Sequence, residues 1–242
     1  MGWKIIGGSV TGKAHITAGI ICQDSSGWRA ADRDVRLVVA DGAGSRLRSA
    51  EGAQVAVEYV LHWPLPGASP SAASLEAALR QMIGDTRDAI KELATGQGYN
   101  AREYATTIAA GIITEEFIAV AQVGDTIAIA GSSGQYKAIE PAAATEYVNE
   151  TTFITDDDAV LSIRLSILPA IEIEAVILST DGLRFKILED LGSGAPFVPF
   201  FEDLVGHARG AHATDESICQ FLSSVDDQSG DDKSLVVAVR ME

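Results

Sequence analysis

Several residue types are scarce in this 242-residue chain, and each scarcity excludes a class of protein. Two cysteines, Cys22 and Cys219, are too few for a disulfide framework. Lysine and arginine number 18 against 34 aspartates and glutamates, so the formal net charge is −16. The phosphates of a nucleic acid and the headgroups of an anionic membrane would repel that charge, and we expect neither as a partner.

Long apolar runs and long linkers are also missing. No uninterrupted apolar run approaches the roughly 20 residues of a membrane span, and residues 1–10 lack the apolar stretch of a secretory signal. We therefore expect a soluble protein of the reducing cytoplasm. No Gly/Ser/Pro linker is long enough to divide the chain, which predicts a single domain over residues 1–242.

Hydrophobic residues make up 47% of the chain, and their spacing predicts its elements. Apolar residues at helical spacing predict helices over residues 50–62, from Leu75 to Gly96, and after Thr214. Short apolar runs predict strands at residues 3–9, 15–22, 35–40, 105–113, 116–123, 126–130, 135–139, 159–167, 172–179 and 234–240. Short turns between the middle strands favour antiparallel pairing. The order predicts an α+β fold with helices covering antiparallel sheets.

The stretch "GGSVTGKA", residues 7–14, nearly matches a phosphate-binding loop of the pattern G-x-x-x-x-G-K-[ST]. That loop needs a hydroxyl where this chain has Ala14, and a helix where the alternating "HITAGIIC" predicts a strand. A hairpin turn is the better interpretation. Cys22, in an apolar run, is interpreted as a small core residue rather than a nucleophile paired with His15. The histidines lack the spacing of a zinc site.

Five aspartates lie at the ends of predicted strands or in the turns beside them: Asp24, Asp41, Asp125, Asp181 and Asp231. Singly, each is more often a turn or capping residue than a ligand. If the strand ends converge, carboxylates 4 to 5 Å apart would repel by roughly 3 to 4 kcal/mol per pair, and divalent cations would reverse that sign. Oxygen ligands without histidine suit Mg²⁺ or Mn²⁺ rather than zinc.

Six short motifs follow one another along most of the chain: "CQDS" (22–25), "VVADGAGS" (38–45), "ATTIAAGII" (105–113), "VGDTIAI" (123–129), "ILSTDGL" (177–183) and "DDKSLVV" (231–237). Each motif is weak alone. Together, and in this order, they resemble the metal-dependent protein phosphatases of the 2C type, in particular the short bacterial branch. The resemblance implies a four-layer α-β-β-α sandwich of two central antiparallel sheets, with two metal ions, Mn²⁺ or Mg²⁺, at one end.

The resemblance also implies a role for each aspartate. Asp41 would bridge two ions, the Gly42 carbonyl would bind one of them, and Asp181 and Asp231 would complete the shell of the second. Asp24 would hold metal-bound water, which places Asp24 and Asp41 as the catalytic residues. Asp125 would join Asp181 at a third, weaker ion. A hydroxide shared by two metals would then attack phosphorus in line.

One position departs from the family pattern. Members usually carry an arginine five residues before the early aspartate, where it grips the phosphate, and this chain has Gly19 there. Four cations are candidate substitutes for phosphate binding, and the sequence does not choose among them: Lys13, His15, Arg46 and Arg184.

The resemblance implies an enzyme that hydrolyses phosphoserine and phosphothreonine on proteins and opposes a serine/threonine kinase. Two alternatives remain. The missing arginine favours a catalytically weak regulatory protein that keeps the fold and binds a partner. The third function is a metal-dependent hydrolase of a small phosphoester.

Overall fold

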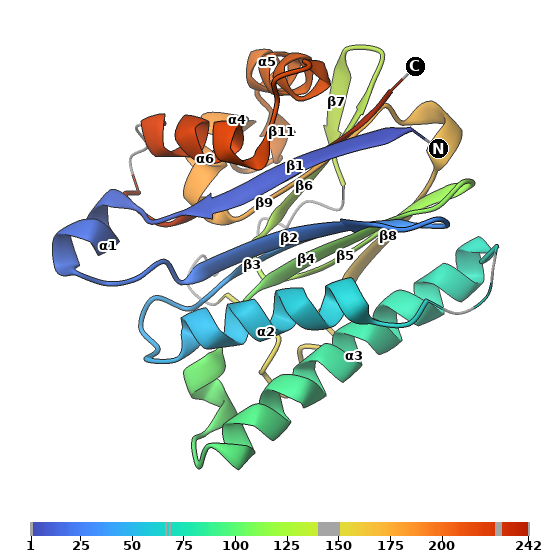
Figure 1. Ribbon diagram of the computed structural model, residues 1–242. Helices are drawn as coiled ribbons and strands as arrows, with labels where there is room; N and C mark the ends of the chain where they lie inside the picture. Colours follow the sequence, from blue (N-terminus) through green and yellow to red (C-terminus); the bar gives the residue numbers. More distant parts are fainter. Residues whose placement is uncertain (1, 66, 68, 140–150, 226–228, 242) are drawn as a thin grey trace.

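The computed structural model describes residues 2–65, 67, 69–139, 151–225 and 229–241. Two five-stranded sheets stack face to face between two layers of helices (Figure 1). The strand order is β1-β12-β9-β6-β7 in the first sheet and β2-β3-β4-β5-β8 in the second, and every pairing is antiparallel. The predicted four-layer sandwich is confirmed.

The first sheet consists of β1 (Trp3–Val10), β6 (Ile127–Ser132), β7 (Gln135–Ala138), β9 (Ala175–Ser179) and β12 (Lys233–Arg240). The second consists of β2 (Asp24–Ala30), β3 (Val35–Asp41), β4 (Ile108–Ile113), β5 (Phe117–Val123) and β8 (Arg164–Pro169). A separate hairpin joins β10 (Leu188–Asp190) to β11 (Ala195–Pro196).

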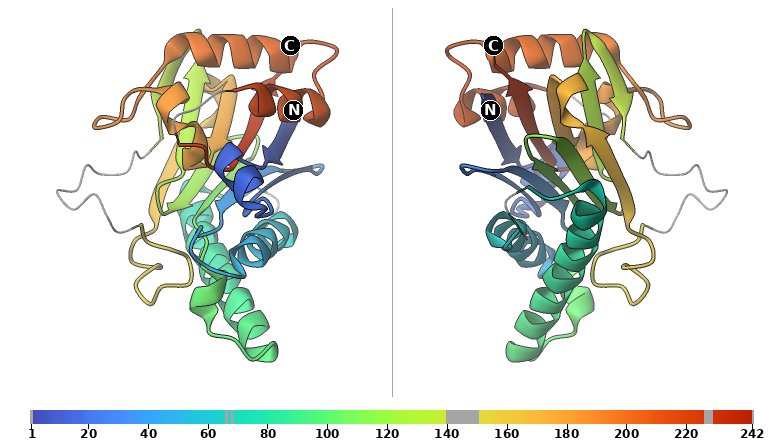
Figure 2. Two further views of the ribbon diagram at one scale, coloured as in Figure 1. Left: turned by 90° about the vertical axis from the view of Figure 1, so that its left-hand side faces the viewer. Right: turned by 90° about the vertical axis from the view of Figure 1, so that its right-hand side faces the viewer.

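Helices α5 (Val198–Arg209) and α6 (Asp215–Ser224) cover the first sheet, and α2 (Ser49–His62) and α3 (Ala72–Gly96) cover the second (Figures 1 and 2). The short elements are α1 (Lys13–Ala18), α4 (Arg184–Ile187) and the 3₁₀ turns η1 (Ala101–Tyr104), η2 (Ala170–Glu172) and η3 (Asp181–Leu183). Among the described residues, no helix combines the length and the apolar character that a membrane span requires.

Alternation along the strands divides the core into three apolar clusters. In β3, Val38 and Ala40 point toward α2 and α3, while Leu37 and Val39 point into the space between the sheets. Because successive side chains of a strand point to opposite faces, a strand buried on both sides reads as one continuous apolar run. This double burial explains the uninterrupted sequence "LVVA".

The predicted strand over residues 15–22 is wrong. Lys13–Ala18 form α1, which buries none of its residues and therefore shows no apolar periodicity. Gly19 ends the helix in the left-handed conformation, at φ 69°, and the amide of Ile20 donates to the His15 carbonyl. The predicted 159–167 strand begins later, at Arg164, because turns occupy residues 154–162.

The helix α1 also removes one argument against a phosphate-binding loop, since a helix does follow the glycines. The loop is nevertheless filled by the protein itself. The Gly12 amide donates to Oδ1 of Asp232 at 2.7 Å, and a Cβ on Gly12 would overlap the backbone of Asp231. Ala14 still lacks the hydroxyl that this type of loop requires.

Candidate metal centre

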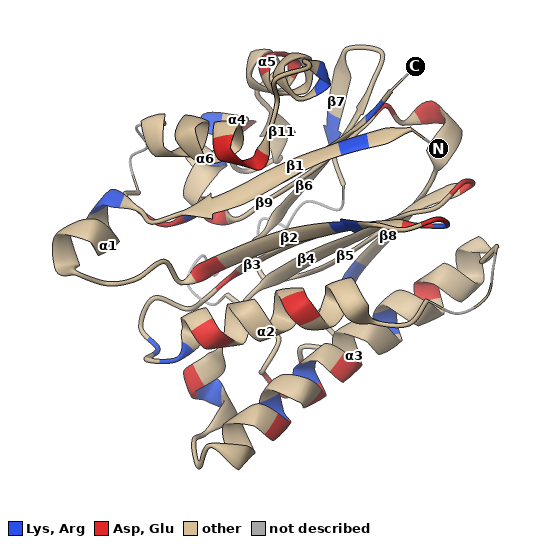
Figure 3. Ribbon diagram, in the orientation of Figure 1, with Lys and Arg blue, Asp and Glu red and all other residues tan. Residues whose placement is uncertain are grey.

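The strand ends that carry the aspartates meet at one end of the sandwich. Asp24 begins β2 and Asp41 ends β3, and the two are direct partners across the antiparallel pair. Asp125 lies in the turn between β5 and β6, which belong to different sheets, and Asp181 follows β9. In Figure 3 acidic residues are red at the start of β2 and at the end of β3.

Asp41, Asp125 and Asp181 form the closest group. One carboxylate oxygen of each lies within 4.8 Å of the other two, so a single cation could be bound by all three. Oδ1 of Asp125 is buried and has no hydrogen-bond partner among the described residues. Three carboxylates, one of which has a buried oxygen without a hydrogen-bond partner, fit a hard divalent cation such as Mg²⁺ or Mn²⁺.

The electrostatics of the group also fit a bound cation. Burial raises the pKa of Asp41 well above its usual value, and the charges of Asp24 and Asp181 raise it further. The pKa of Asp181 rises to about 6, mainly through burial, while the Arg184 guanidinium opposes the rise. Without a cation, these carboxylates therefore carry a cost when ionised.

Asp24 is 9% exposed, and its carboxylate belongs to a hydrogen-bonded group. Oδ2 accepts a hydrogen bond from the Thr180 hydroxyl at 2.7 Å, and that hydroxyl oxygen accepts from the Ser234 amide at 3.0 Å. Burial raises the pKa of Asp24 to about 8, and the charge of Asp232 contributes. Thr180 thus ties Asp24 of the second sheet to β9 and β12 of the first.

Asp231 lies outside the group of three, although its charge raises the pKa of Asp24, Asp41 and Asp181. Its neighbour Asp232 is 3% exposed and accepts from the amides of Gly12, at 2.7 Å, and Gln23, at 2.6 Å. Asp232 therefore holds the segment between β1 and α1, and the segment before β2, next to the start of β12.

The two Asp-Gly turns need glycine for space. A Cβ on Gly42 would approach the Gln23 carbonyl oxygen and the backbone of Ser49 within 2.6 to 2.7 Å. A Cβ on Gly182 would overlap the carbonyl oxygen of Asp232. Close backbone approach thus explains why a glycine follows each aspartate, and it fixes where the carboxylates lie.

The four candidate phosphate-binding cations differ in their surroundings. Arg184 Nη1 lies 3.5 Å from Oδ2 of Asp181, so it borders the carboxylate group directly. His15 Nδ1 lies 2.9 Å from Oδ2 of Asp232, outside hydrogen-bond geometry. Arg46 Nη1 is 4.0 Å from Glu103, and Lys13 begins α1 with an exposed side chain. At Gly19, nothing lies within 4 Å of an added Cβ.

Sequence reasoning missed Asp232, Thr180 and Gln23, which hold the aspartates in place without belonging to the predicted ligands. Thr180 and Asp232 adjoin predicted site residues in "STDG" and "DDKS", and this adjacency was the only available signal. Gln23 likewise adjoins Asp24 in "CQDS", but its side-chain amide donates to Ser49 Oγ at 2.9 Å, a contact between separate segments that the sequence does not indicate.

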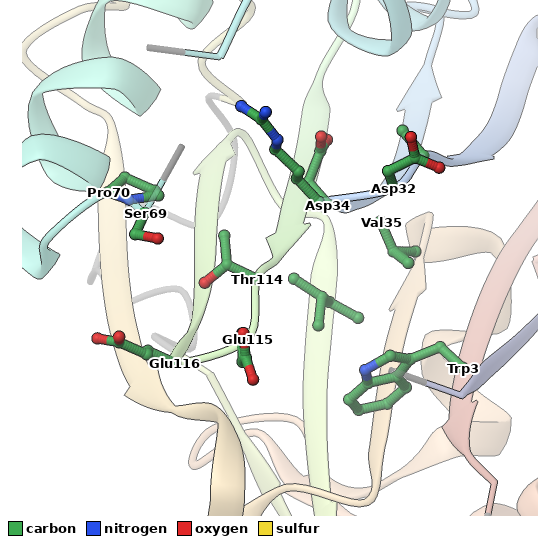
Figure 4. A pocket seen from close by; sticks show the side chains of 12 residues that line it. Trp3, Asp32, Asp34, Val35, Ser69, Pro70, Thr114, Glu115 and Glu116 are labelled. Carbon is green, nitrogen blue, oxygen red and sulfur yellow. The ribbon is translucent and has the colours of Figure 1, made fainter. Parts of the chain in front are cut away.

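A separate hollow of about 210 Å³ lies at the opposite end of the sheets (Figure 4). The turns β2–β3 and β4–β5 line it, with Trp3, Asp34, Thr114 and Glu116 among the labelled side chains. Because Asp24 and Asp41 lie at the other ends of β2 and β3, this hollow contains none of the candidate site residues.

The arrangement of aspartates agrees with a comparison of whole sequences. The sequence model of protein phosphatase 2C matches residues 11–223. The chain belongs to the protein phosphatase 2C family. It is also similar to serine/threonine-protein phosphatase 3 of Escherichia coli (strain K12), with 29% identity over the full length of both chains.

Solved structures of bacterial members share the fold. One, described as a bacterial serine phosphatase, has a TM-score of 0.73 and 18% identity, covering 99% of this chain and 98% of that chain. The serine/threonine phosphatase Stp1 from Staphylococcus aureus has a TM-score of 0.72 and 16% identity, covering 100% of this chain and 96% of that chain. At such identities the likeness shows the architecture of this protein phosphatase 2C member, not its substrate.

Proposed function

We propose that this chain hydrolyses phosphoserine and phosphothreonine on proteins with the help of two Mn²⁺ or Mg²⁺ ions, and opposes a serine/threonine kinase. The observation that carries the proposal is the group formed by Asp41, Asp125 and Asp181, three carboxylates within 4.8 Å of one another. Burial raises the pKa of Asp41 and of Asp181, so their ionised forms are costly, and bound cations would remove that cost. The activity named for the Escherichia coli relative supports the same reaction.

The chain's own residues have distinct roles in this proposal. Asp41 would hold both ions from the end of β3, and the Gly42 carbonyl would hold one of them. Asp181 and Asp231 would hold the second ion from the first sheet, and Asp125 would join Asp181 at a weaker third site. When bound, the ions would acidify a water molecule and neutralise the phosphoryl oxygens. Asp24 is held by the Thr180 hydroxyl and would orient that water by accepting a hydrogen bond from it.

We also propose that residues 1–242 act as a single domain. One apolar cluster contains side chains of both sheets, among them Val39 of β3 and Val236 of β12, so neither sheet buries its inner face without the other.

The proposed reaction is tested by turnover of p-nitrophenyl phosphate and of a phosphothreonine peptide in Mn²⁺, in Mg²⁺ and in EDTA. We expect activity in the two metals and none in EDTA. Full activity in the metal-stripped protein would exclude the two-metal reaction. Faster turnover of small phosphorylated metabolites than of phosphopeptides would favour the small-phosphoester alternative instead.

A catalytically weak regulatory protein is the second candidate, because the position of the family's arginine holds Gly19 with open space around it. Retention of the three clustered carboxylates supports the enzyme. Mn²⁺ binding without turnover of either substrate would favour the regulatory protein.

A further inference from the structure

Four branched apolar side chains are exposed on two segments beside the aspartates. Ile16, Ile20 and Ile21 are 65%, 41% and 73% exposed, and Leu47, the most exposed large apolar side chain of the described residues, is 94% exposed. We call Ile16, Ile20, Ile21 and Leu47 the apolar ledge. Single exposed apolar residues are ordinary, but a group of them beside a candidate active site indicates binding.

Two members of the ledge enclose a hollow. Ile21 and Leu47 line a cavity of about 440 Å³ together with Arg48 and Tyr99. The Arg48 guanidinium lies 3.8 Å from the centre of the Tyr99 ring and bonds to Glu51 at 3.0 Å, which fixes that wall. The hollow thus places two exposed apolar side chains opposite an aromatic and cationic wall.

Gln23 connects the hollow to the proposed metal centre. The side-chain amide of Gln23 donates to the backbone carbonyl of Arg46 and to Ser49 Oγ. The backbone carbonyl of Gln23 accepts from the Gly42 amide. Ile21 is only three residues before Asp24, so their Cα atoms are at most about 11 Å apart. An extended peptide would cover that distance with about three residues.

Charge also favours approach from this side. The chain carries a net charge of −16, which repels a phosphorylated segment over most of the surface. Arg46 and Arg48 flank Leu47, and the loop into α2 is blue in Figure 3, at the same end of the molecule as α1. Arg46 pairs with Glu103 and Arg48 with Glu51, and both glutamates line the hollow, so this face is close to neutral. It therefore repels a phosphorylated segment less than a purely acidic face would.

We propose that the hollow between Ile21 and Leu47 receives a bulky apolar side chain of the phosphorylated protein segment, about three residues from the phosphoserine or phosphothreonine. This inference rests on the proposed function and names the class of substrate: segments that combine a phosphorylated residue with a nearby leucine-like residue. A second copy of the chain fits the hollow less well. Stable dimers bury about 20 to 30 residues on each side, and seven residues line this hollow.

The test uses two pairs of labelled peptides that carry a non-hydrolysable phosphonate in place of phosphothreonine. The two peptides of a pair are identical except at one position, which holds leucine in one peptide and serine in the other. That position lies three residues before the phosphonate in the first pair and three residues after it in the second. Fluorescence anisotropy in Mn²⁺ measures their Kd, so the readout does not require turnover. The proteins are wild type, Leu47→Ser, Ile21→Ser and, as a matched control, Ile171→Ser, whose side chain is 86% exposed in η2.

We expect wild type and Ile171→Ser to bind the leucine peptide of one pair about five- to tenfold more tightly, as partial burial of a leucine predicts. Leu47→Ser and Ile21→Ser should bring the ratio of the two Kd values close to one. Equal Kd values within both pairs in wild type, no peptide binding, or a preference kept in both ledge variants would overturn the inference. The inference would also be overturned if Leu47→Ser or Ile21→Ser left peptide binding unchanged and, in sedimentation, only converted a dimer to monomers. Turnover of p-nitrophenyl phosphate by wild type tests the proposed function separately.

Discussion

Asp24 and Asp41 face each other directly across the β2–β3 pair, at the ends of their strands. Side chains at such partner positions have Cβ atoms about 4.5 to 5.5 Å apart, and like charges there destabilise a sheet. The pKa of both carboxyls is raised, mainly by burial and further by neighbouring carboxylates. We therefore expect a fold that keeps two opposed aspartates beside Asp181 and Asp125 to gain stability when cations bind.

The first prediction concerns Asp41→Asn in the presence and absence of metal. Removing one charge relieves repulsion with Asp24 and Asp181, so the variant should melt several degrees higher than wild type in EDTA. In Mn²⁺ the order should reverse, because the proposed bridging ligand is missing. Activity should fall by several orders of magnitude. Thermal melts in both conditions, with turnover assays, check these expectations.

Asp203→Asn is the matched control for that experiment, since Asp203 is exposed on α5. It should change neither the melting temperature nor the shift caused by Mn²⁺. An equal Mn²⁺-induced shift in wild type and Asp41→Asn would exclude the bridging role of Asp41.

The second prediction is a pH dependence of the metal-free protein. The pKa of Asp24 is about 8 and that of Asp181 about 6, against 3.8 for an ordinary aspartic acid. Between about pH 4 and pH 8 the folded chain therefore holds protons that the unfolded chain has released. Raising the pH through that window should lower the free energy of unfolding measured by urea titration in EDTA.

Mn²⁺ should flatten the same profile, because bound cations replace the protons on the carboxylates. Asp24→Asn should reduce the slope between pH 6 and pH 8 in EDTA. A wild-type free energy of unfolding that rises over this window in EDTA would contradict the raised pKa values.

The third prediction compares two glycines. Gly182→Ala should destabilise the fold by about 1 to 3 kcal/mol or more, since its Cβ would overlap the Asp232 carbonyl oxygen and push β12 from the Asp-Gly turn. Gly84→Ala, inside α3 with open space around the added Cβ, should stabilise it by about 0.5 to 1 kcal/mol. Urea unfolding of both variants measures the difference. A neutral Gly182→Ala would show that the close approach is not required.

The fourth prediction concerns the cysteines. Burial, with the charges of Asp232 and Asp24, raises the pKa of Cys22 to about 12, so the reactive thiolate is scarce at neutral pH. Iodoacetamide at pH 7.5 should label Cys22 slowly and leave activity unchanged, and Cys22→Ser should remain active. Rapid inactivation that Cys22→Ser prevents would assign the thiol a role in the reaction.

The architecture was predictable from sequence where burial leaves a pattern. Long helices such as α3 show a stripe of apolar residues, and β3 shows a continuous run because it is covered on both faces. By contrast α1 buries no residue, and β2, with the sequence "DSSGWRA", alternates only weakly, so neither leaves such a pattern. These two elements carry His15 and Asp24, and their placement depends on contacts with Asp232 and Thr180.

The grouping of Asp41, Asp125 and Asp181 was predictable, because an aspartate beside a buried strand and a glycine is chemically conspicuous. The roles of these aspartates as metal ligands stay predictions. The sequence did not predict the different structural roles of the adjacent residues Asp231 and Asp232. Asp231 and Asp232 look alike in the sequence, yet Asp232 is buried and bonded to two amides, while Asp231 is partly exposed. Only the tertiary contacts of Gly12 and Gln23 separate them.

The fifth prediction concerns the residue that grips the phosphate in place of the family's arginine. We expect one of four single substitutions to raise KM for a phosphopeptide clearly, with a smaller effect on Mn²⁺ affinity: Lys13→Ala, His15→Ala, Arg46→Ala or Arg184→Ala. Each removes a cation that borders the proposed metal centre or the loops beside it. Steady-state kinetics at saturating Mn²⁺, together with Mn²⁺ titrations by calorimetry, separate the two effects.

Arg184→Ala has a second expected result, because Arg184 lies 3.5 Å from Asp181 and opposes the rise of its pKa. Its loss should strengthen Mn²⁺ binding near pH 7 while it weakens phosphate binding, a combination that general damage to the fold would not produce. Arg80→Ala, which removes only an exposed pair with Glu76 on α3, is the matched control and should change neither quantity. If all four variants keep the wild-type KM, no substitute cation exists, and the open space at Gly19 leaves the phosphate to the metal ions alone.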